Sequence, residues 1–125
     1  LLGIAVLKQQ HYLEQAVLSL LPNQIKQSSN WRIAHEFHRG GYAKFSQIDA
    51  DRIRTFSHIV GIDFEPIYSG KMILALLDLI ASGYFPEHHR IVLLHTGGLQ
   101  GLAGMFERGL LNQDEWPLLP APPVR

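Results

Sequence analysis

Two glycine-containing segments of this chain carry side chains that could bind and act on a ligand. In the first, residues 65–72 (EPIYSGKM), Pro66 fixes the backbone ahead of an apolar run, and Gly70 leaves room in the first turn of that run. If the run is helical, Tyr68 and Ser69 lie at its N-terminus with their hydroxyls facing a cleft. A structural interpretation is the commoner case, in which Tyr68 packs in the interior and Ser69 caps the helix.

The second segment, residues 91–99 (IVLLHTGGL), predicts a strand followed by a tight turn. Ligands of parallel sheets bind beyond the carboxyl ends of strands, which is where Thr96, Gly97 and Gly98 would lie. Backbone N–H groups in such a turn, and the N-terminus of the helix after it, favour an anion. Glycines that only reverse the chain explain the turn equally well. His95 at the strand end is more often a hydrogen-bonded core residue than a catalyst.

The composition narrows the kinds of partner that the chain could have. Its 125 residues carry eleven basic and eleven acidic side chains, so the formal charge is zero and we expect no nucleic-acid partner. No apolar run is long enough to span a bilayer, so we expect no membrane segment. The chain has no cysteine, which suits a reducing, cytoplasmic location.

Seven histidines raise the question of a metal site. His35 and His38 are three positions apart, and His88 and His89 are adjacent, but no carboxylate pattern such as His-Glu-x-x-His accompanies them. Because zinc needs three or four converging ligands, we predict that the chain holds no metal ion.

The spacing of apolar residues predicts alternating helices and strands. In the first half we expect short strands at 3–7 and 31–37, a helix at 10–21 between them, and a glycine turn at 39–42. In the second half we expect helices at 49–60, 69–81 and 99–111. The run 90–95 is the strongest predicted strand, because it is apolar on both faces as the strands of parallel sheets are.

This order of elements predicts an α/β fold with a mostly parallel sheet and helices on both faces. We expect residues 1–112 to form one unit and residues 113–125, which hold four prolines, to form a weakly ordered tail. The chain begins with Leu1 in what is predicted to be a buried strand, and such a strand needs neighbours on both sides. We therefore expect the sequence to be a piece of a longer polypeptide.

The two ligand-binding segments, in this order and with an apolar helix and a strand between them, resemble the C-terminal signature of a known enzyme family. It is the 1-aminocyclopropane-1-carboxylate (ACC) deaminase / D-cysteine desulfhydrase family. Residues 3–8 (GIAVLK) and 40–43 (GGYA) also resemble family segments. The resemblance implies the large domain of a tryptophan synthase β-like (fold type II) enzyme, with pyridoxal 5'-phosphate in the cleft between two domains.

The resemblance also implies roles for individual residues. Tyr42 and Tyr68 would face the cofactor and the substrate, and one of them would take part in proton transfer or nucleophilic attack. A second set would bind the cofactor: Ser69 at its pyridine nitrogen and, lining or supporting the same end of the ring, His95, Thr96, Gly97 and Gly98.

Two positions depart from the pattern of the enzymes that open the cyclopropane ring. The resemblance implies the motifs Tyr-Glu-Gly-Lys and His-Leu-Gly-Gly in those enzymes. In this chain Ser69 stands in place of the glutamate and Thr96 in place of the leucine. A glutamate beside the pyridine nitrogen favours its protonated form, which is the better electron sink, and a hydroxyl supplies no such charge. The two hydroxyls therefore favour a D-cysteine desulfhydrase, which eliminates hydrogen sulfide and ammonia to leave pyruvate.

The family's Schiff-base lysine and its phosphate-binding loop belong to the N-terminal portion, upstream of the matched segments. None of the lysines Lys8, Lys26, Lys44 and Lys71 stands in a context like that of the cofactor lysine. We therefore expect this chain alone to be inactive and to need the missing N-terminal part of its polypeptide. The family further implies a small amino-acid substrate and a homodimer. The alternative is a non-catalytic α/β domain that binds an anion or a partner through the turn 96–98.

Overall fold

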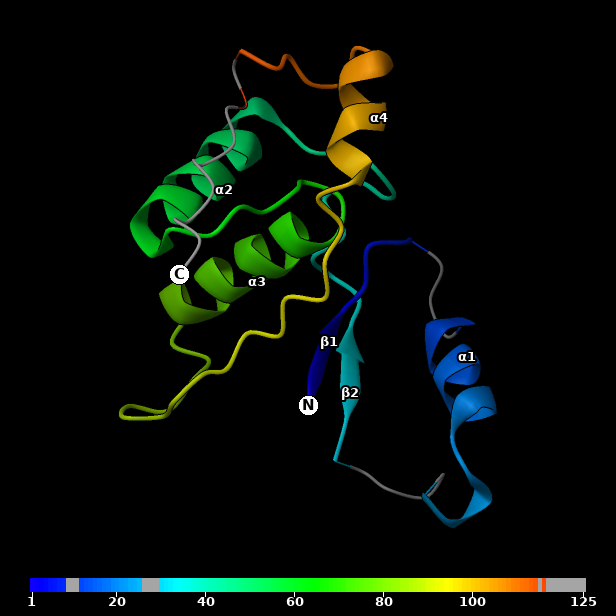
Figure 1. Ribbon diagram of the computed structural model, residues 1–125. Coiled ribbons are helices and arrows are strands. Elements are labelled where there is room, and N and C mark those ends of the chain that lie inside the picture. The colour runs from blue at the N-terminus through cyan, green and yellow to red at the C-terminus, as the bar shows by residue number, and fades with distance from the viewer. Residues whose placement is uncertain (9–11, 26–29, 115, 117–125) are drawn as a thin grey trace, which may run out of the picture.

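The computed structural model describes residues 1–8, 12–25, 30–114 and 116. Most of the predicted tail, residues 113–125, lies outside these described residues. The elements, in chain order, are β1 (Leu2–Ile4), α1 (Tyr12–Leu20), the short 3-10 helix η1 (Asn23–Ile25), β2 (Arg32–Ala34), α2 (Gln47–Val60), α3 (Ser69–Ala81) and α4 (Gly101–Glu107). Figure 1 shows how they are arranged.

The strands β1 and β2 lie parallel, with Gly3 opposite Ile33, and this confirms the α/β class and the parallel pairing. The ladder continues past both ends of β1, because Ala5 N–H donates to the Ala34 carbonyl over 2.9 Å and Arg32 N–H donates to the Leu1 carbonyl over 3.1 Å. Helix α1 lies beside β2 and helix α3 beside β1, on opposite sides of the strand pair (Figure 1). Within the described residues the sheet has two strands, both shorter than predicted.

The predicted strand at 90–95 is wrong. This segment has no regular secondary structure, and its side chains are largely exposed: Val92 is 89 % exposed and Leu94 is 68 % exposed. A run of apolar residues favours an extended backbone, but a strand exists only where a neighbouring chain pairs with it. The ladder of β1 and β2 stops short of this segment. An apolar groove of about 180 Å³, lined in part by Leu2, Met72 and Leu93, separates it from β1 and α3.

Helix α2 shows why the local sequence begins and ends it where it does. Asp49 N–H donates to the Ser46 hydroxyl over 3.1 Å, and Ser46 N–H donates to the Asp49 carboxylate over 3.1 Å. Ser46 and Asp49 therefore form one capping box. At the other end, Gly61 adopts a φ of 69°, and its N–H donates to the Ser57 carbonyl over 2.8 Å. Glycine adopts this left-handed backbone without steric cost.

Helix α3 is the centre of the core, as its nearly uniform apolar sequence predicts. Ile73 and Leu74 are fully buried on it and pack with Ile53 of α2. Other members of the same cluster come from the loop before α3, from α4 and from the end of the described chain: Phe64, Leu102, Met105 and Trp116. The predicted helix at 99–111 is present but is shorter, because α4 ends at Glu107.

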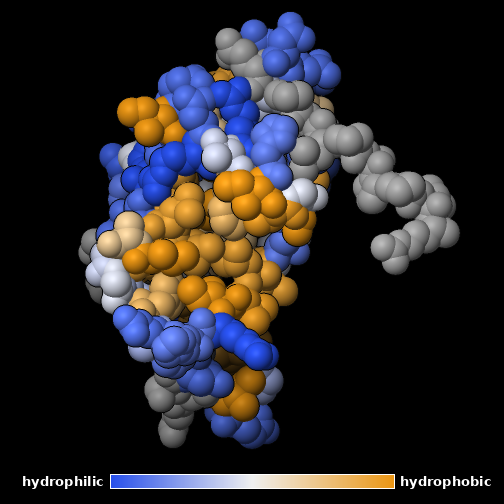
Figure 2. Space-filling model, turned by 90° about the vertical axis from the view of Figure 1, so that its left-hand side faces the viewer, coloured by the Kyte–Doolittle hydropathy of each residue, from blue (hydrophilic) through white to orange (hydrophobic). Residues whose placement is uncertain are grey.

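Not every apolar side chain of the helices is covered. Figure 2 shows a continuous apolar area on the side of the molecule where α2 and α3 lie in Figure 1. Ile48 and Ile59 of α2 are 72 % and 77 % exposed, and Ile80 of α3 is 53 % exposed. A surface of this kind marks a place where a protein meets something else. None of the helices in the described part of the chain is both long enough and apolar enough to cross a membrane.

Candidate functional site

The start of α3 is built around the carboxylate of Glu65, which is 1 % exposed. One of its oxygens accepts the N–H of Ile67 over 2.6 Å, and the other accepts the N–H of Tyr68 over 2.9 Å and of Ser69 over 2.6 Å. The N–H groups of Tyr68 and Ser69 are among the backbone donors that the start of a helix leaves without partners. An anion is also favoured there by the helix dipole. Glu65 is therefore the cap of α3.

Ser69 lies directly beneath this carboxylate and is 6 % exposed. Its hydroxyl donates to Glu65 Oε1 over 3.0 Å and accepts the backbone N–H of Glu65 over 3.0 Å. The hydroxyl proton is thus committed to Glu65, and only acceptor capacity remains on the oxygen. The hydroxyl lies at the helix N-terminus, as predicted, but it is buried and bonded to Glu65 and does not face an open cleft.

Gly70 is required by the close approach of the chain to itself. A Cβ added at this position would lie 2.5 Å from the Glu65 carbonyl oxygen and 2.7 Å from Ile53 Cδ1. Its own N–H donates to that carbonyl over 2.6 Å. The glycine therefore allows the turn 65–70 to close under the helix and to pack against α2.

Lys71 is fully buried, although lysine is among the residues least often found in an interior. Its ammonium group donates to the His38 carbonyl over 2.9 Å and also to the Gly41 carbonyl. Burial lowers the pKa of Lys71, while the negative charges of Glu65 and Asp49 act in the opposite direction. Helix α3 thereby holds the glycine turn that precedes Tyr42.

The phenols of Tyr42 and Tyr68 meet above the start of α3. Tyr68 Oη donates to Tyr42 Oη over 3.2 Å, and the ring centroids are 6.0 Å apart in an edge-to-face arrangement. Both side chains are about half exposed, so both reach solvent. The hydrogen bond to Tyr42, burial and the charge of Glu65 all raise the pKa of Tyr68 above its ordinary value of 10.0. This phenol therefore keeps its proton at neutral pH and can donate it.

His95 ties the second motif to the loop before α3. Its Nε2 lies 2.9 Å from the Asp63 carbonyl and its Nδ1 lies 3.1 Å from the N–H of Gly97. A carbonyl only accepts and an amide N–H only donates, so the ring carries its proton on Nε2. The ring also stacks on Phe64, with centroids 5.1 Å apart. His95 is therefore a hydrogen-bonded link between the two loops.

The two predicted motifs meet at Gly98. This glycine has a φ of 106°, and a Cβ added to it would lie 3.2 Å from Glu65 Oε1. Gly98 therefore lies against the same carboxylate that caps α3. Gly97 has a φ of 100° with open space around it, and Thr96 is exposed beside it. The structure thus brings the turn 96–98 to the start of α3, next to Tyr68 and Ser69.

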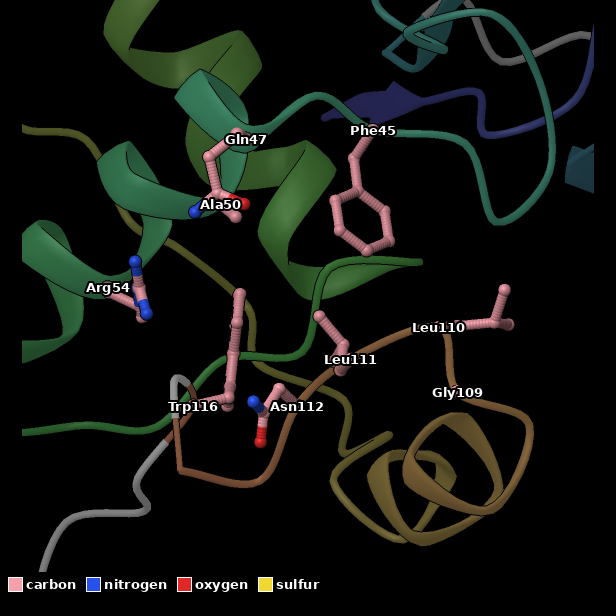
Figure 3. A pocket seen from close by; sticks show the side chains of 9 residues that line it. All are labelled: Phe45, Gln47, Ala50, Arg54, Gly109, Leu110, Leu111, Asn112 and Trp116. Carbon is pink, nitrogen blue, oxygen red and sulfur yellow. The ribbon is translucent and has the colours of Figure 1, made fainter.

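The pocket in Figure 3 lies elsewhere. It has a volume of about 220 Å³ and lies between the start of α2 and residues 109–116, where Phe45, Arg54 and Trp116 line it. None of the predicted site residues contributes to it. Within the described residues, no group of three or more His, Asp and Glu side chains is arranged to hold a metal ion.

The roles of Glu65 and Lys71 in this region are not predicted from the sequence. The sequence predicts no function for Glu65 within its motif, and for Lys71 it predicts only that this residue is not the cofactor lysine. A signal for both was present: a charged residue immediately beside a run of apolar ones is expensive to bury unless it has partners. Each proves to be fully buried and hydrogen-bonded.

Comparison with curated proteins finds relatives for about half of the chain. The ACC deaminase of Allorhizobium ampelinum is 35 % identical over 63 residues, which is 50 % of this chain and 19 % of the relative. That of Rhizobium rhizogenes is 34 % identical over 47 % of this chain and 18 % of the relative. That of Methylobacterium nodulans is 33 % identical over 50 % of this chain and 19 % of the relative.

These matches confirm the resemblance to the ACC deaminase / D-cysteine desulfhydrase family that the two motifs indicated. Each match covers less than a fifth of the relative's own length, since the shares are 19 %, 18 % and 19 %. No family profile and no solved structure matches the chain.

Proposed function

Starting from this family resemblance, we propose that the chain forms part of a pyridoxal-phosphate-dependent deaminase that acts on a small amino acid. The observation that carries the proposal is the phenol pair at the start of α3, with 3.2 Å between the Tyr42 and Tyr68 hydroxyls. The turn 96–98, which the resemblance assigns to the same pocket, lies against the cap of that helix. Relatives named ACC deaminase support the same class of enzyme.

The described residues fit one end of the cofactor and lack the group that anchors it. When bound, pyridoxal phosphate draws electrons from the α-carbon of an amino acid. Ser69, His95 and the turn 96–98 would line its pyridine end. Lys71 does not fit the role of the Schiff-base lysine, because its ammonium is fully buried and donates to two backbone carbonyls. The proposal therefore places that lysine in another part of the polypeptide.

In this proposal the two phenols handle the proton. The Tyr68 hydroxyl is the donor of the pair and reaches solvent, so in this proposal it is the group that donates toward a substrate atom. Tyr42 orients that hydroxyl by accepting its hydrogen bond in the resting site. A proton that leaves Tyr68 Oη toward the substrate ends the bond to Tyr42. Tyr42 can then give its own proton to the same oxygen and take one from water, because its side chain reaches solvent.

The geometry of Ser69 bears on the choice of substrate. The sequence argument for D-cysteine was that a serine supplies no charge to the pyridine nitrogen. In the structure the hydroxyl donates to the carboxylate of Glu65, so its oxygen is a pure acceptor with an anion behind it. An acceptor of this kind favours a protonated ring nitrogen, as a glutamate would. We therefore put ACC first among the substrates, and the names of the relatives agree with that order.

D-cysteine remains the second candidate because of Thr96. At this position the resemblance implies a leucine in the enzymes that open the cyclopropane ring. A threonine adds a hydroxyl to an exposed turn, which suits a substrate with a polar side chain better than one with a hydrocarbon ring. The homodimer, the cytoplasmic location and the need for an N-terminal part all belong to the same proposal. The non-catalytic alternative has no observation that favours it over the enzyme.

The test uses the complete polypeptide that carries this chain, loaded with pyridoxal 5'-phosphate. We expect ammonia from ACC faster than from D-cysteine, and we expect Tyr68→Phe to lower kcat about 100-fold, since a positioned acid contributes roughly 10²–10⁴. Tyr12→Phe, on the exposed surface of α1, is the matched control and should leave kcat unchanged.

Faster release of sulfide from D-cysteine than of ammonia from ACC would reverse the order of substrates. A polypeptide that neither shows the visible absorption of bound cofactor nor turns over either amino acid would overturn the function.

A further inference from the structure

Lys71 is the most unusual polar residue of the described chain, because its whole side chain is buried in the first turn of α3. Removing an ammonium group from water is costly unless its donors are satisfied. Burial lowers the pKa of Lys71, because the interior disfavours the charged form of the ammonium group. A neutral apolar residue of the same length would fill this space without that cost.

The partners of Lys71 all belong to one loop. Its ammonium donates to the His38 carbonyl over 2.9 Å and to the Gly41 carbonyl. Among the described residues no side-chain carboxylate is paired with it directly, although the charges of Glu65 and Asp49 act on it from a distance. The ammonium group therefore binds backbone carbonyls, and these carbonyls belong to the turn before Tyr42.

That turn has a conformation that would not persist unaided. The φ angles are 54° at Arg39, 98° at Gly40, 120° at Gly41 and 54° at Ala43. A left-handed backbone costs a residue with a Cβ about 1 kcal/mol or more, so Arg39 and Ala43 are both strained. Such strain persists only where surrounding contacts determine the conformation.

The turn has some internal hydrogen bonds. Gly40 N–H donates to His38 Nδ1 over 3.0 Å, and Gly41 N–H donates to the His38 carbonyl over 3.0 Å. Arg39 adds an ion pair with Asp78 of α3 at the half-exposed rim of the turn. The charge of Arg39 and a hydrogen bond from Arg52 outweigh burial and lower the pKa of Asp78. In the interior, by contrast, Lys71 joins the carbonyl groups of the turn to α3.

The position of Lys71 in the helix explains what the clamp achieves. Lys71 follows Tyr68 by three residues, and residues three apart lie on the same side of a helix. The ammonium end of the Lys71 side chain donates to the carbonyl of Gly41, the residue before Tyr42. One turn of α3 therefore presents the Tyr68 phenol and also fixes the chain that carries the Tyr42 phenol.

We propose that Lys71 is a positioning residue whose buried ammonium sets the contact between the Tyr42 and Tyr68 hydroxyls. This role rests on the proposed function only because the phenol pair is the acid there. The clamp, by which we mean the hydrogen bonds of the Lys71 ammonium to the turn, is a property of this chain itself. Without the ammonium, the two carbonyls keep only the backbone hydrogen bonds of the turn itself, the turn loses its interior link to α3, and Tyr42 leaves Tyr68.

The first test needs no variant and no cofactor. In the wild-type chain we expect NMR to detect the Lys71 ammonium protons, slowed in exchange with water, with nuclear Overhauser contacts to residues 38 and 41. Rapid exchange and the absence of those contacts would overturn the proposal outright.

The second test reads the phenols directly. Titration of the tyrosine Cζ resonances should show the Tyr68 pKa in Lys71→Met falling to the value found in Tyr42→Phe, because both variants lose the same hydrogen bond. Lys44→Met removes an exposed lysine from the same turn and is the matched control, in which Tyr68 should titrate as in the wild type. A merely structural lysine would lower the free energy of unfolding without moving this pKa. A folded Lys71→Met in which Tyr68 titrates as in the wild type therefore contradicts the proposal.

Should Lys71→Met not fold, Lys71→Cys supplies the only thiol, because the chain has no cysteine. Alkylation in denaturant to S-aminoethylcysteine restores an ammonium group at nearly the same length. Refolding with the wild-type Tyr68 titration is the expected result, and the first test decides if neither form folds. Because both tests lack the cofactor, their failure leaves the proposed enzyme activity standing, and an inactive enzyme leaves the clamp standing.

Discussion

The start of α3 and the segment 90–98 carry the two motifs of the site, but they are held in place in opposite ways. At the start of α3 the polar groups are satisfied within a few residues, since the Glu65 carboxylate accepts the N–H groups of the three residues 67–69. The segment 90–98 has no such closure. Most of its apolar side chains are exposed, as Val92 shows at 89 %, although Leu93 packs against the core. His95 and Gly98 attach the segment to the loop before α3.

The difference teaches which structures a short stretch of sequence can build alone. A helix cap needs an acceptor a few residues from the orphan N–H groups, and the segment EPIYSG supplies one. A strand needs a second strand at the right register, and that requirement lies outside its own sequence. The first motif is therefore rigid by itself, whereas the second depends on what pairs with it.

The largest effect is expected where the first motif is most crowded. Gly70→Ala places a Cβ 2.5 Å from a backbone carbonyl oxygen, which the turn has no room for. We expect the free energy of unfolding to fall by about 3 kcal/mol, the upper range for overpacking a core, as measured from the urea dependence of the helical signal.

Gly104→Ala is the matched control, because Gly104 is inside α4 and a Cβ there meets nothing within 4 Å. It should raise stability by about 0.5–1 kcal/mol through helix propensity alone. Equal effects of the two substitutions would show that the turn at Gly70 is not closed as described.

A smaller loss is expected on weakening the cap itself. Glu65→Gln keeps the size of the side chain but replaces a carboxylate that accepts three N–H groups with an amide that has one acceptor oxygen. We expect a loss of about 2 kcal/mol, since charge-assisted hydrogen bonds are each worth roughly 1.5–3 kcal/mol. The exposed Glu87→Gln should be neutral by comparison. A cap variant as stable as that control would refute the role given to Glu65.

The smallest effect is expected in the second motif. Val92→Ala removes two methyl groups that are already in water, so stability should change by no more than about 0.5 kcal/mol. The same kind of truncation at the fully buried Ile73 should cost about 3 kcal/mol. A loss of 1 kcal/mol or more at Val92 would mean that the segment is packed in solution, as the sequence predicted.

The contrast between the motifs also explains how far the sequence predicted the fold. Helices α2 and α3 were predicted with the correct C-terminal residues, Val60 and Ala81, because the signals that end them are local. The parallel pairing of β1 with β2 followed from the alternation of helices and strands. The strand at 90–95 was wrong because hydrophobicity records a preference for burial and says nothing about which chain is available to pair.

For the site, the sequence identified the right segments and missed the chemistry between them. Tyr42 and Tyr68 were named from the family resemblance, and the structure brings their hydroxyls together. That Lys71 would reach back to residues 38 and 41 depends on distances that no spacing rule contains. Contacts across 30 or more residues are what the linear pattern lacks.

A single site formed by both motifs requires that the turn 96–98 lie against the Glu65 side chain at the start of α3. The nuclear Overhauser contact between the α-protons of Gly98 and the γ-protons of Glu65 measures this directly, because a Cβ at Gly98 would lie 3.3 Å from Glu65 Cγ. We expect a strong cross-peak between the two groups in the wild-type chain. A spectrum in which Glu65 shows its contacts to residues 67–69 but none to Gly98 would separate the two motifs and contradict a shared site.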